Sequence, residues 1–375
     1  MVHLEHLYCD GLRNLADVDL VAGRHRTLIV GDNGQGKTNL LEAIHLAASL
    51  RPLKPVERHS DLVGEGRGHA VIRARFEAAG PLPVELVIEP KGKRATMAGK
   101  TIKDASELWR QVGVVSFLPD DNAIVRGAPE LRRRALDRVA FSLDAGFAGV
   151  AKRFEDALDR RNRVLKAARV DLALLLSYDE PYAAAAAALS QARARAALRL
   201  GPCFAAEARA IGGDALAASL RYQSAVDDDL GDDPGAGSEE SLAAALRERL
   251  QLARELELKR RTTAHGPHHD DVAILKADRK ARFLASQGEA RALVLALKLA
   301  QVRLVSETRG AGPLLLLDDV AGELDPERAA RLFHAADETG AQTFVTTTHA
   351  EALPELRHAT RVRMQAGHLF AEDRP

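Results

Sequence analysis

Hydrophobic and polar residues alternate through the first part of the chain, which is the pattern of half-buried strands. The pattern predicts strands at residues 2–9, 16–21, 26–30, 70–76 and 84–88, a hairpin over 94–102 and a buried strand over 112–118. One stretch has helical spacing instead, because residues 39–50 place Leu40, Leu41 and Ile44 on a single face. The N-terminal part is therefore predicted to be a mixed β lobe with one helix after its third strand.

The middle of the chain has a different period. Apolar residues recur every three or four positions over 129–169, 182–211 and 242–258, which predicts long helices packed as a bundle or an antiparallel arm. Residues 227–240 are acidic and rich in Gly and Pro, so an exposed, mobile loop is expected there. Rows of arginines on these helices suit either DNA phosphates or solvated helix faces with local ion pairs, and the second interpretation is favoured.

Alternation of strands and helices returns after residue 265. The run 314–317 is entirely leucine, as in a central parallel strand buried on both faces, and 343–347 is a second such candidate. A helix is expected over 327–337. We therefore predict an α/β fold: a nucleotide-binding head with an N-terminal mixed β lobe, split by a helical domain. The expected division is 1–118 and 266–375 for the head and 119–265 for the helical arm or lid.

Composition narrows the possible partners and location. The chain has 375 residues with 53 basic and 53 acidic side chains, so it has no net charge that would attract nucleic acid or a membrane electrostatically. Any DNA contact must come from a local patch or from a groove between two subunits. The two cysteines, Cys9 and Cys203, are far apart, which favours a reducing compartment and argues against a cysteine metal site. We see no signal-peptide core and no run long enough to cross a bilayer, so a cytoplasmic location is expected.

A glycine-rich loop between a predicted strand and a predicted helix carries the clearest chemistry. Its residues are Gly31, Asp32, Asn33, Gly34, Gln35, Gly36, Lys37 and Thr38. The glycines let backbone N–H groups converge on an anion, and the following helix adds the positive end of its dipole. Lys37 is suited to reach the β and γ phosphates of a nucleotide, and Thr38 to place its hydroxyl on Mg²⁺. A plain glycine turn is the alternative, but the complete pattern in this context favours a phosphate site.

Two carboxylates follow the leucine strand. Asp318 is suited to hold Mg²⁺, through water, and Asp319 to orient or polarise an attacking water. A polar strand end alone is common, but one that follows a complete phosphate loop favours the functional interpretation. Further on, Asp325 is expected to cap the helix over 327–337.

Two further features fit the same chemistry. Ser286 and Gly288 open a second helix, and a hydroxyl with free N–H groups at a helix start also binds phosphate. The loop at 31–38 is already expected to surround the phosphates bound by its own subunit. A second phosphate-binding helix start in the same chain therefore suggests a site completed by a second subunit. His349 ends the strand at 343–347, where an imidazole is placed to sense the γ-phosphate, although a histidine at a strand end is more often structural.

In this order the motifs resemble the ABC-type ATPase heads of the SMC and RecF group. The stretches 31–43, 266–271 and 286–300 are similar to the RecF family in particular, and the helical insertion has the size found there. The resemblance implies an ATP-dependent homodimer that sandwiches two nucleotides. It assigns Lys37 and Thr38 to phosphate and Mg²⁺, and Asp318 and Asp319 to metal and catalysis. It also places Ser286 and Gly288 in trans, Asp325 in a loop that links the subunits, and His349 as the switch.

Membership of the RecF family would further imply binding to duplex DNA and gapped junctions, and work with RecR and RecO in loading RecA during DNA repair, replication and the SOS response. A weak DNA-dependent ATPase acting as a switch is expected, since Asp319 stands where many ABC heads have Glu. His269 occupies a position that is usually Arg, and Asp120 or Asp121 is the candidate for a missing glutamine-loop residue. The alternatives are a transporter ATPase subunit, another SMC-like DNA ATPase, or a small-molecule kinase. A kinase would use the phosphate loop, but it would leave residues 286–289 and His349 without a role.

Overall fold

The structure, a computed structural model, describes residues 2–225, 238–319, 326–349, 351, 353 and 356–372. Packing divides the chain into two compact units: residues 1–122 with 294–375, and residues 123–293. The first boundary lies close to the expected one at 118. The second lies at 293 instead of 265, because strand β10 (Asp271–Lys276) pairs with β9 (Ala218–Gln223) inside the second unit.

The first unit contains a six-stranded, mainly parallel sheet in the order β15-β14-β3-β13-β12-β8. Its strands are β3 (Arg26–Val30), β8 (Val114–Phe117), β12 (Leu314–Leu317), β13 (Gln342–Thr347), β14 (Thr360–Gln365) and the antiparallel edge strand β15 (His368–Ala371). Every residue of β8, β12 and β13 is buried, which confirms the buried strands predicted over 112–118, 314–317 and 343–347. The parallel order places the carboxyl ends of β3, β13 and β12 side by side.

Helices of the first unit are α1 (Lys37–Ser49), α2 (Ala105–Gln111) and α13 (Pro326–Glu338), and α11 (Gln287–Arg309) runs from the second unit into the first. Helix α1 begins at Lys37, within the last two residues of the glycine-rich loop and two residues earlier than the sequence predicted, and it buries Leu40, Leu41 and Ile44 as expected. The first turn of α1 therefore contains Lys37 and Thr38, the last two residues of the loop. The expected helix at 327–337 is confirmed as α13, whereas Asp325 lies outside the described residues.

The N-terminal lobe of this unit is an antiparallel sheet in the order β2-β1-β4-β5-β6-β7. Its strands are β1 (His3–Asp10), β2 (Val18–Val21), β4 (Ala70–Glu77), β5 (Pro81–Glu89), β6 (Gly92–Met97) and β7 (Lys100–Thr101). Burial alternates along β4, which is the half-buried pattern read from the sequence. The β lobe predicted for this part of the chain is confirmed, but its sheet is antiparallel throughout and not mixed.

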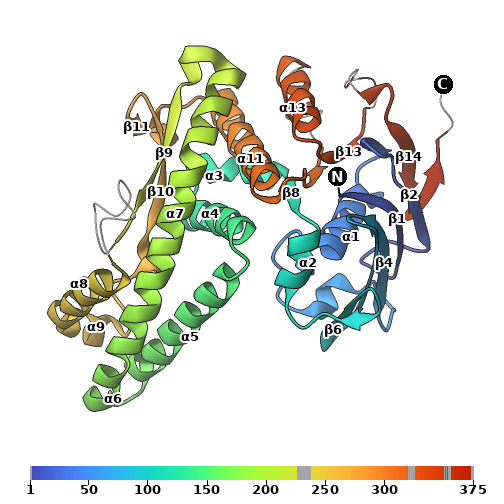
Figure 1. Ribbon diagram of the computed structural model, residues 1–375. Helices are drawn as coiled ribbons and strands as arrows, with labels where there is room; N and C mark the ends of the chain where they lie inside the picture. The colour runs from blue at the N-terminus through green and yellow to red at the C-terminus, as the bar shows by residue number, and fades with distance from the viewer. Residues whose placement is uncertain are drawn as a thin grey trace. The chain divides into compact units, whose positions relative to one another are not determined.

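The second unit combines helices with a small sheet. Its helices are α3 (Ala123–Arg126), α4 (Pro129–Leu143), α5 (Phe147–Lys166), α6 (Leu172–Ser177), α7 (Asp179–Gly212), α8 (Glu239–Leu252), α9 (Arg254–Arg260) and α10 (Ala281–Leu284). Helices α5 and α7 pack side by side, joined through the short α6 (Figure 1). The antiparallel sheet β11-β10-β9, with β11 at Arg279–Lys280, was not predicted. The single helix expected over 242–258 is divided into α8 and α9, because the first helix ends and the second begins at Ala253.

Short 3₁₀ turns complete the described elements, at His59–Leu62, Pro119–Asn122, Gly213–Leu216 and Pro267–His269. The acidic loop expected at 227–240 lies mostly outside the described residues, and its last two residues, Glu239 and Glu240, begin α8.

Arginines of the predicted rows form ion pairs within the second unit. Arg161 is fully buried, and its guanidinium donates to Glu257 at 2.9 and 2.6 Å and to Asp179 at 3.0 Å. Arg193 is also buried and donates to both oxygens of Asp137, at 2.7 and 2.9 Å. These arginines form the local ion pairs that were expected, but they are buried and do not lie on the solvated helix faces that the sequence suggested.

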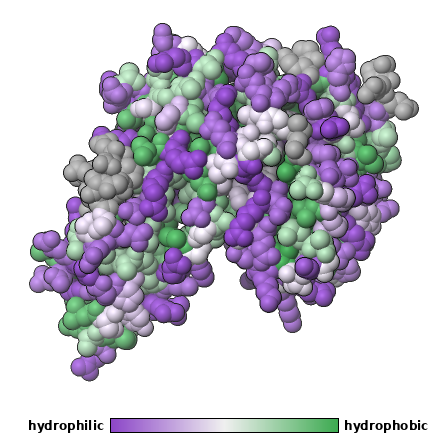
Figure 2. Space-filling model, viewed as in Figure 1, coloured by the Kyte–Doolittle hydropathy of each residue, from purple (hydrophilic) through white to green (hydrophobic). Residues whose placement is uncertain are grey.

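Exposed apolar side chains gather at α6. Leu172, Leu174 and Leu176 are 51%, 44% and 56% exposed, and Figure 2 shows hydrophobic surface at the end of this unit where α6 lies.

None of the described helices combines the length and the apolar character that a membrane span requires.

Candidate nucleotide-binding site

The glycine-rich loop connects β3 to α1 and needs glycine at specific positions. Gly34 and Gly36 have φ angles of +80° and +106°, in the left-handed region that L-residues rarely adopt. At Gly31 the reason is proximity, because a Cβ would stand 2.4 Å from the carbonyl oxygen of Met364. The loop conformation therefore depends on the glycines that the sequence singled out.

Two neighbouring segments brace this loop. The Asn14 side-chain amide donates to the Gly34 carbonyl at 3.3 Å, and the Asn14 oxygen accepts from Asn39 at 2.7 Å. On the other side, the Gln35 side-chain oxygen accepts from the backbone N–H of Ala366 at 2.6 Å. The sequence did not predict these contacts, because both segments lie far from the loop along the chain.

Lys37 lies inside the loop. Its ammonium donates to the carbonyl oxygens of Gly31 at 2.6 Å and Asp32 at 2.9 Å, and the side chain is buried. Burial lowers the pKa of Lys37, and the carboxylates of Asp319 and Asp318 partly offset this effect. The loop thus holds a cation at the start of α1, in the position expected for a phosphate contact.

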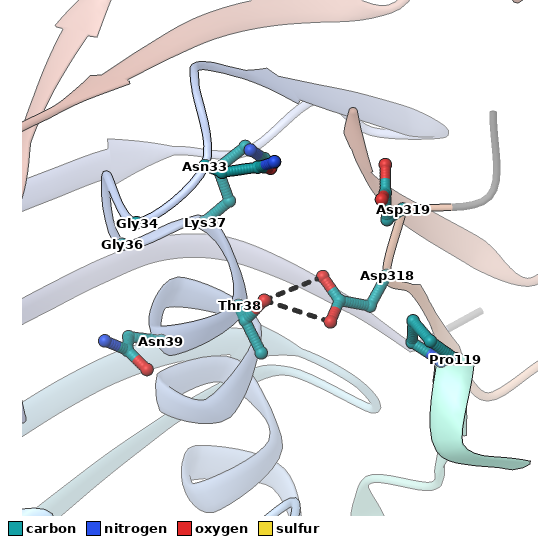
Figure 3. A pocket seen from close by; sticks show the side chains of 9 residues that line it. All are labelled: Asn33, Gly34, Gly36, Lys37, Thr38, Asn39, Pro119, Asp318 and Asp319. Atoms are coloured by element: carbon teal, nitrogen blue, oxygen red, sulfur yellow. Dashed lines mark hydrogen bonds between the residues drawn. The ribbon is translucent and has the colours of Figure 1, made fainter. Parts of the chain in front are cut away.

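The acidic pair follows β12 and faces the first turn of α1. The Thr38 hydroxyl donates to both carboxylate oxygens of Asp318, at 3.0 Å each (Figure 3). Asp318 is buried, whereas the next residue, Asp319, turns away with a φ of +52°. A hydroxyl and a carboxylate are the oxygen donors that Mg²⁺ prefers, so these residues fit the metal assigned to them.

A cavity of about 320 Å³ lies between the loop and the acids. It is lined by Asn33, Gly34, Gly36, Lys37, Thr38, Asn39, Pro119, Asp318 and Asp319 (Figure 3). The structure therefore brings together residues that lie almost three hundred positions apart in the sequence, and most of the predicted phosphate and metal residues line this cavity.

Among the described site residues that the sequence predicted, Gly31, Asp32 and Gln35 of the loop do not line the cavity, and neither do Ser286, Gly288 and His349. Ser286 and Gly288 belong to the second unit, where the Ser286 N–H donates to the Glu289 carboxylate at 2.8 Å and the Glu289 N–H to the Ser286 hydroxyl at 3.2 Å. This reciprocal cap starts α11. His349 is exposed after β13, and its N–H donates to the Thr347 hydroxyl at 3.0 Å. Their roles toward a nucleotide stay predictions.

The candidates for the glutamine-loop position have other partners. Asp121 is buried, accepts from the Leu118 N–H at 2.9 Å and pairs with Lys298 at 2.9 Å. Asp120 pairs with Lys54 at 2.7 Å. Among the residues of this segment, it is Pro119 that reaches the cavity wall.

The stretch 266–271 forms hydrogen bonds and ion pairs within the second unit. Asp270 is fully buried and accepts from the Tyr222 hydroxyl and from the Ala225 N–H, while Asp271 pairs with Arg132 at 2.7 Å. These bonds join the stretch to β9 and α4. His269, which departs from the usual Arg, is exposed on this segment.

Known proteins are similar to this chain over nearly its whole length. A family model described as "RecF/RecN/SMC N terminal domain" matches residues 3–370. A protein from Myxococcus xanthus called "DNA replication and repair protein RecF" is 40% identical over 91% of this chain and 90% of its own length. The protein of the same name from Thermosynechococcus vestitus is 35% identical over 98% and 95%. The chain belongs to the RecF family.

Solved structures agree with this RecF assignment. A structure described as "the recombination mediator protein RecF-ATPrS in RecFOR pathway" has a TM-score of 0.88 at 27% identity, covering 99% of this chain and 98% of the other. An Smc head domain from Pyrococcus furiosus, at 15% identity and a TM-score of 0.53, shares the fold. The resemblance and the expected fold, a P-loop ABC-type ATPase head, are confirmed.

Proposed function

We propose that this chain binds ATP with Mg²⁺ in the cavity beside α1, and that bound ATP closes a homodimer on DNA. The observation that carries the proposal is the contact of Thr38 with Asp318, which joins the phosphate loop to the acidic strand end at 3.0 Å. RecF relatives whose structures are described with ATP support the choice of nucleotide.

Each residue of the cavity has a role in this proposal. Lys37 exchanges its loop carbonyls for the β and γ phosphates, and backbone N–H groups of the loop bind the remaining oxygens. Thr38 and Asp318 hold Mg²⁺, which supplies positive charge against the phosphates. Asp319 orients the attacking water, with the shorter carboxylate consistent with slow hydrolysis. His349 senses the γ-phosphate.

The second half of the site comes from another copy of the chain. Ser286 and Gly288 of one subunit contact the γ-phosphate bound by the other, and Asp325 links the two. Ser286→Arg is therefore expected to leave nucleotide binding intact while blocking ATP-dependent dimerisation, measured by sizing chromatography. A variant that no longer binds nucleotide would mean that Ser286 supports its own subunit's site.

The dimer acts on DNA in replication and repair. We propose that it binds duplex DNA and prefers gapped junctions, and that hydrolysis releases it, as in a switch biased by nucleotide. Family membership supports the further proposal that the chain works with RecR and RecO in loading RecA. That membership also favours this function over a transporter ATPase.

The function is tested by fluorescence anisotropy with labelled gapped duplex, uniform duplex and single strands, each with ATP, ADP or no nucleotide. We expect the tightest binding to gapped duplex with ATP, and loss of that ATP effect in Lys37→Ala because its phosphate contact is gone. The matched control is Lys100→Ala, an exposed lysine on β7. Equal binding in all nucleotide states would refute the switch.

A further inference from the structure

One buried hydroxyl on β13 contacts both acids of the site. Thr346 has no exposed surface, and its Oγ1 donates to Asp318 Oδ1 at 2.7 Å. The same oxygen accepts the backbone N–H of Asp319 at 3.0 Å. Thr346 does not line the cavity, so its contacts are with the acids and not with a bound nucleotide.

The strand order explains why a residue of β13 reaches this position. Strand β13 lies between β3, which leads into the phosphate loop, and β12, which leads into the acids. In the parallel register Val345 is opposite Leu317, so the next residues, Thr346 and Asp318, are level with each other. The contact follows from sheet geometry, and no local sequence pattern signals it.

The Thr346 hydroxyl both donates and accepts a hydrogen bond. A threonine hydroxyl has one proton to donate, which goes to Asp318, and lone pairs that accept, one of which takes the Asp319 N–H. Asp319 has a φ of +52°, an uncommon conformation for a residue other than glycine. The bond from its N–H therefore holds the turn that directs the second acid away from the first.

We propose that Thr346 is a positioning residue that orients the Asp318 carboxylate for the metal and fixes the turn that aims Asp319. The inference rests on the proposed binding of ATP with Mg²⁺. Hydrogen-bond partners of metal ligands typically change metal affinity or activity by about 10- to 100-fold when removed. Thr346 holds this place for Asp318, on the carboxylate oxygen that Thr38 also contacts.

Other threonines of the same strand have different partners and supply controls. The Thr347 hydroxyl is engaged with the backbone of His349, at 3.0 and 3.3 Å. Thr343 is equally buried, but its hydroxyl has only a 3.5 Å contact with the Ala341 carbonyl. Thr343→Val therefore matches Thr346→Val in burial, strand and chemical change, without touching the acids.

The experiment measures equilibrium binding of a fluorescent, slowly hydrolysed ATP analogue with Mg²⁺ and with EDTA. Thr346→Val is expected to weaken binding by about 10-fold in Mg²⁺, and to leave binding in EDTA unchanged. Thr346→Ser, which keeps the hydroxyl, and Thr343→Val are expected to bind as the wild type does. Thr346→Ala removes the same hydroxyl and replaces the valine variant if that protein does not fold.

The outcomes separate this inference from the proposed function. Wild-type affinity of Thr346→Val in Mg²⁺ would overturn the inference alone, because the nucleotide site would still bind. An equal loss in Mg²⁺ and in EDTA would also overturn it, since the hydroxyl would then support the fold and not the metal side of the site. A wild-type protein that binds no nucleotide would overturn both.

Discussion

Replacing Gly36 with alanine tests the phosphate loop where its backbone is most constrained. Gly36 has a φ of +106° and a ψ of 6° directly before α1. An added Cβ would lie 3.0 Å from Asn14 Oδ1, 3.2 Å from Leu15 Cδ2 and 3.2 Å from Met364 Cε. Leu15 and Met364 are both buried, so making room for the added Cβ requires shifts of side chains inside the core.

The magnitude has two parts. A non-glycine residue held in a sparsely populated backbone region costs about 1–3 kcal/mol. Adding a methyl group to a well-packed environment costs about 1–3 kcal/mol more. If the loop keeps its shape, the sum appears as lost stability; if it relaxes, the sum appears as weaker nucleotide binding, about tenfold for each 1.4 kcal/mol.

Gly34→Ala is the matched control. Gly34 also has a positive φ, +80°, but nothing lies within 4 Å of an added Cβ, so only the backbone part applies. Both variants are assayed for thermal unfolding and for binding of a fluorescent ATP analogue, and the two free-energy losses are added. A combined loss in Gly36→Ala no greater than in Gly34→Ala would refute the argument from packing.

Two further predictions concern the second unit. Glu257→Ala leaves the buried Arg161 guanidinium without its bidentate partner, so the free energy of unfolding should fall by about 3–5 kcal/mol in chemical denaturation. The control is Asp156→Asn, which removes the charge from the exposed pair with Lys152, and an equally small effect of both variants would contradict the argument. Burial lowers the pKa of His268 to about 4, below the 6.5 of the unfolded chain, so the unfolded state takes up protons first. Stability should therefore decline as pH falls from 6.5 towards 4, and His268→Gln should show a shallower decline over that range.

Local pattern predicted the elements around the site well. Strands β3 and β12 were expected with the bounds that the structure shows, because each is a short apolar run that ends in a strong signal, glycine in one case and paired acids in the other. The loop at 31–38 was predicted for the same reason, since its glycines are required by local backbone geometry.

Elements that depend on distant partners were missed. Strand β9 is short and pairs with β10 about fifty residues later, so no local period distinguishes it from the surrounding helices. This pairing keeps residues 271–276 in the second compact unit, whereas the sequence pattern grouped them with the head. The braces at Asn14 and Gln35 were also missed, since a single asparagine or glutamine carries no signal of what it will contact.

The sequence by itself determined the chemistry of this protein: a phosphate loop, a lysine, a threonine and two acids, each of a type that only a few functions require. The tertiary structure decided their arrangement. Strand order and register, set by packing between segments far apart in the chain, bring Thr38 to Asp318 and insert Thr346 between the loop strand and the acid strand. A hydrogen bond across a sheet depends on which strands are neighbours, and that choice is made by the whole core.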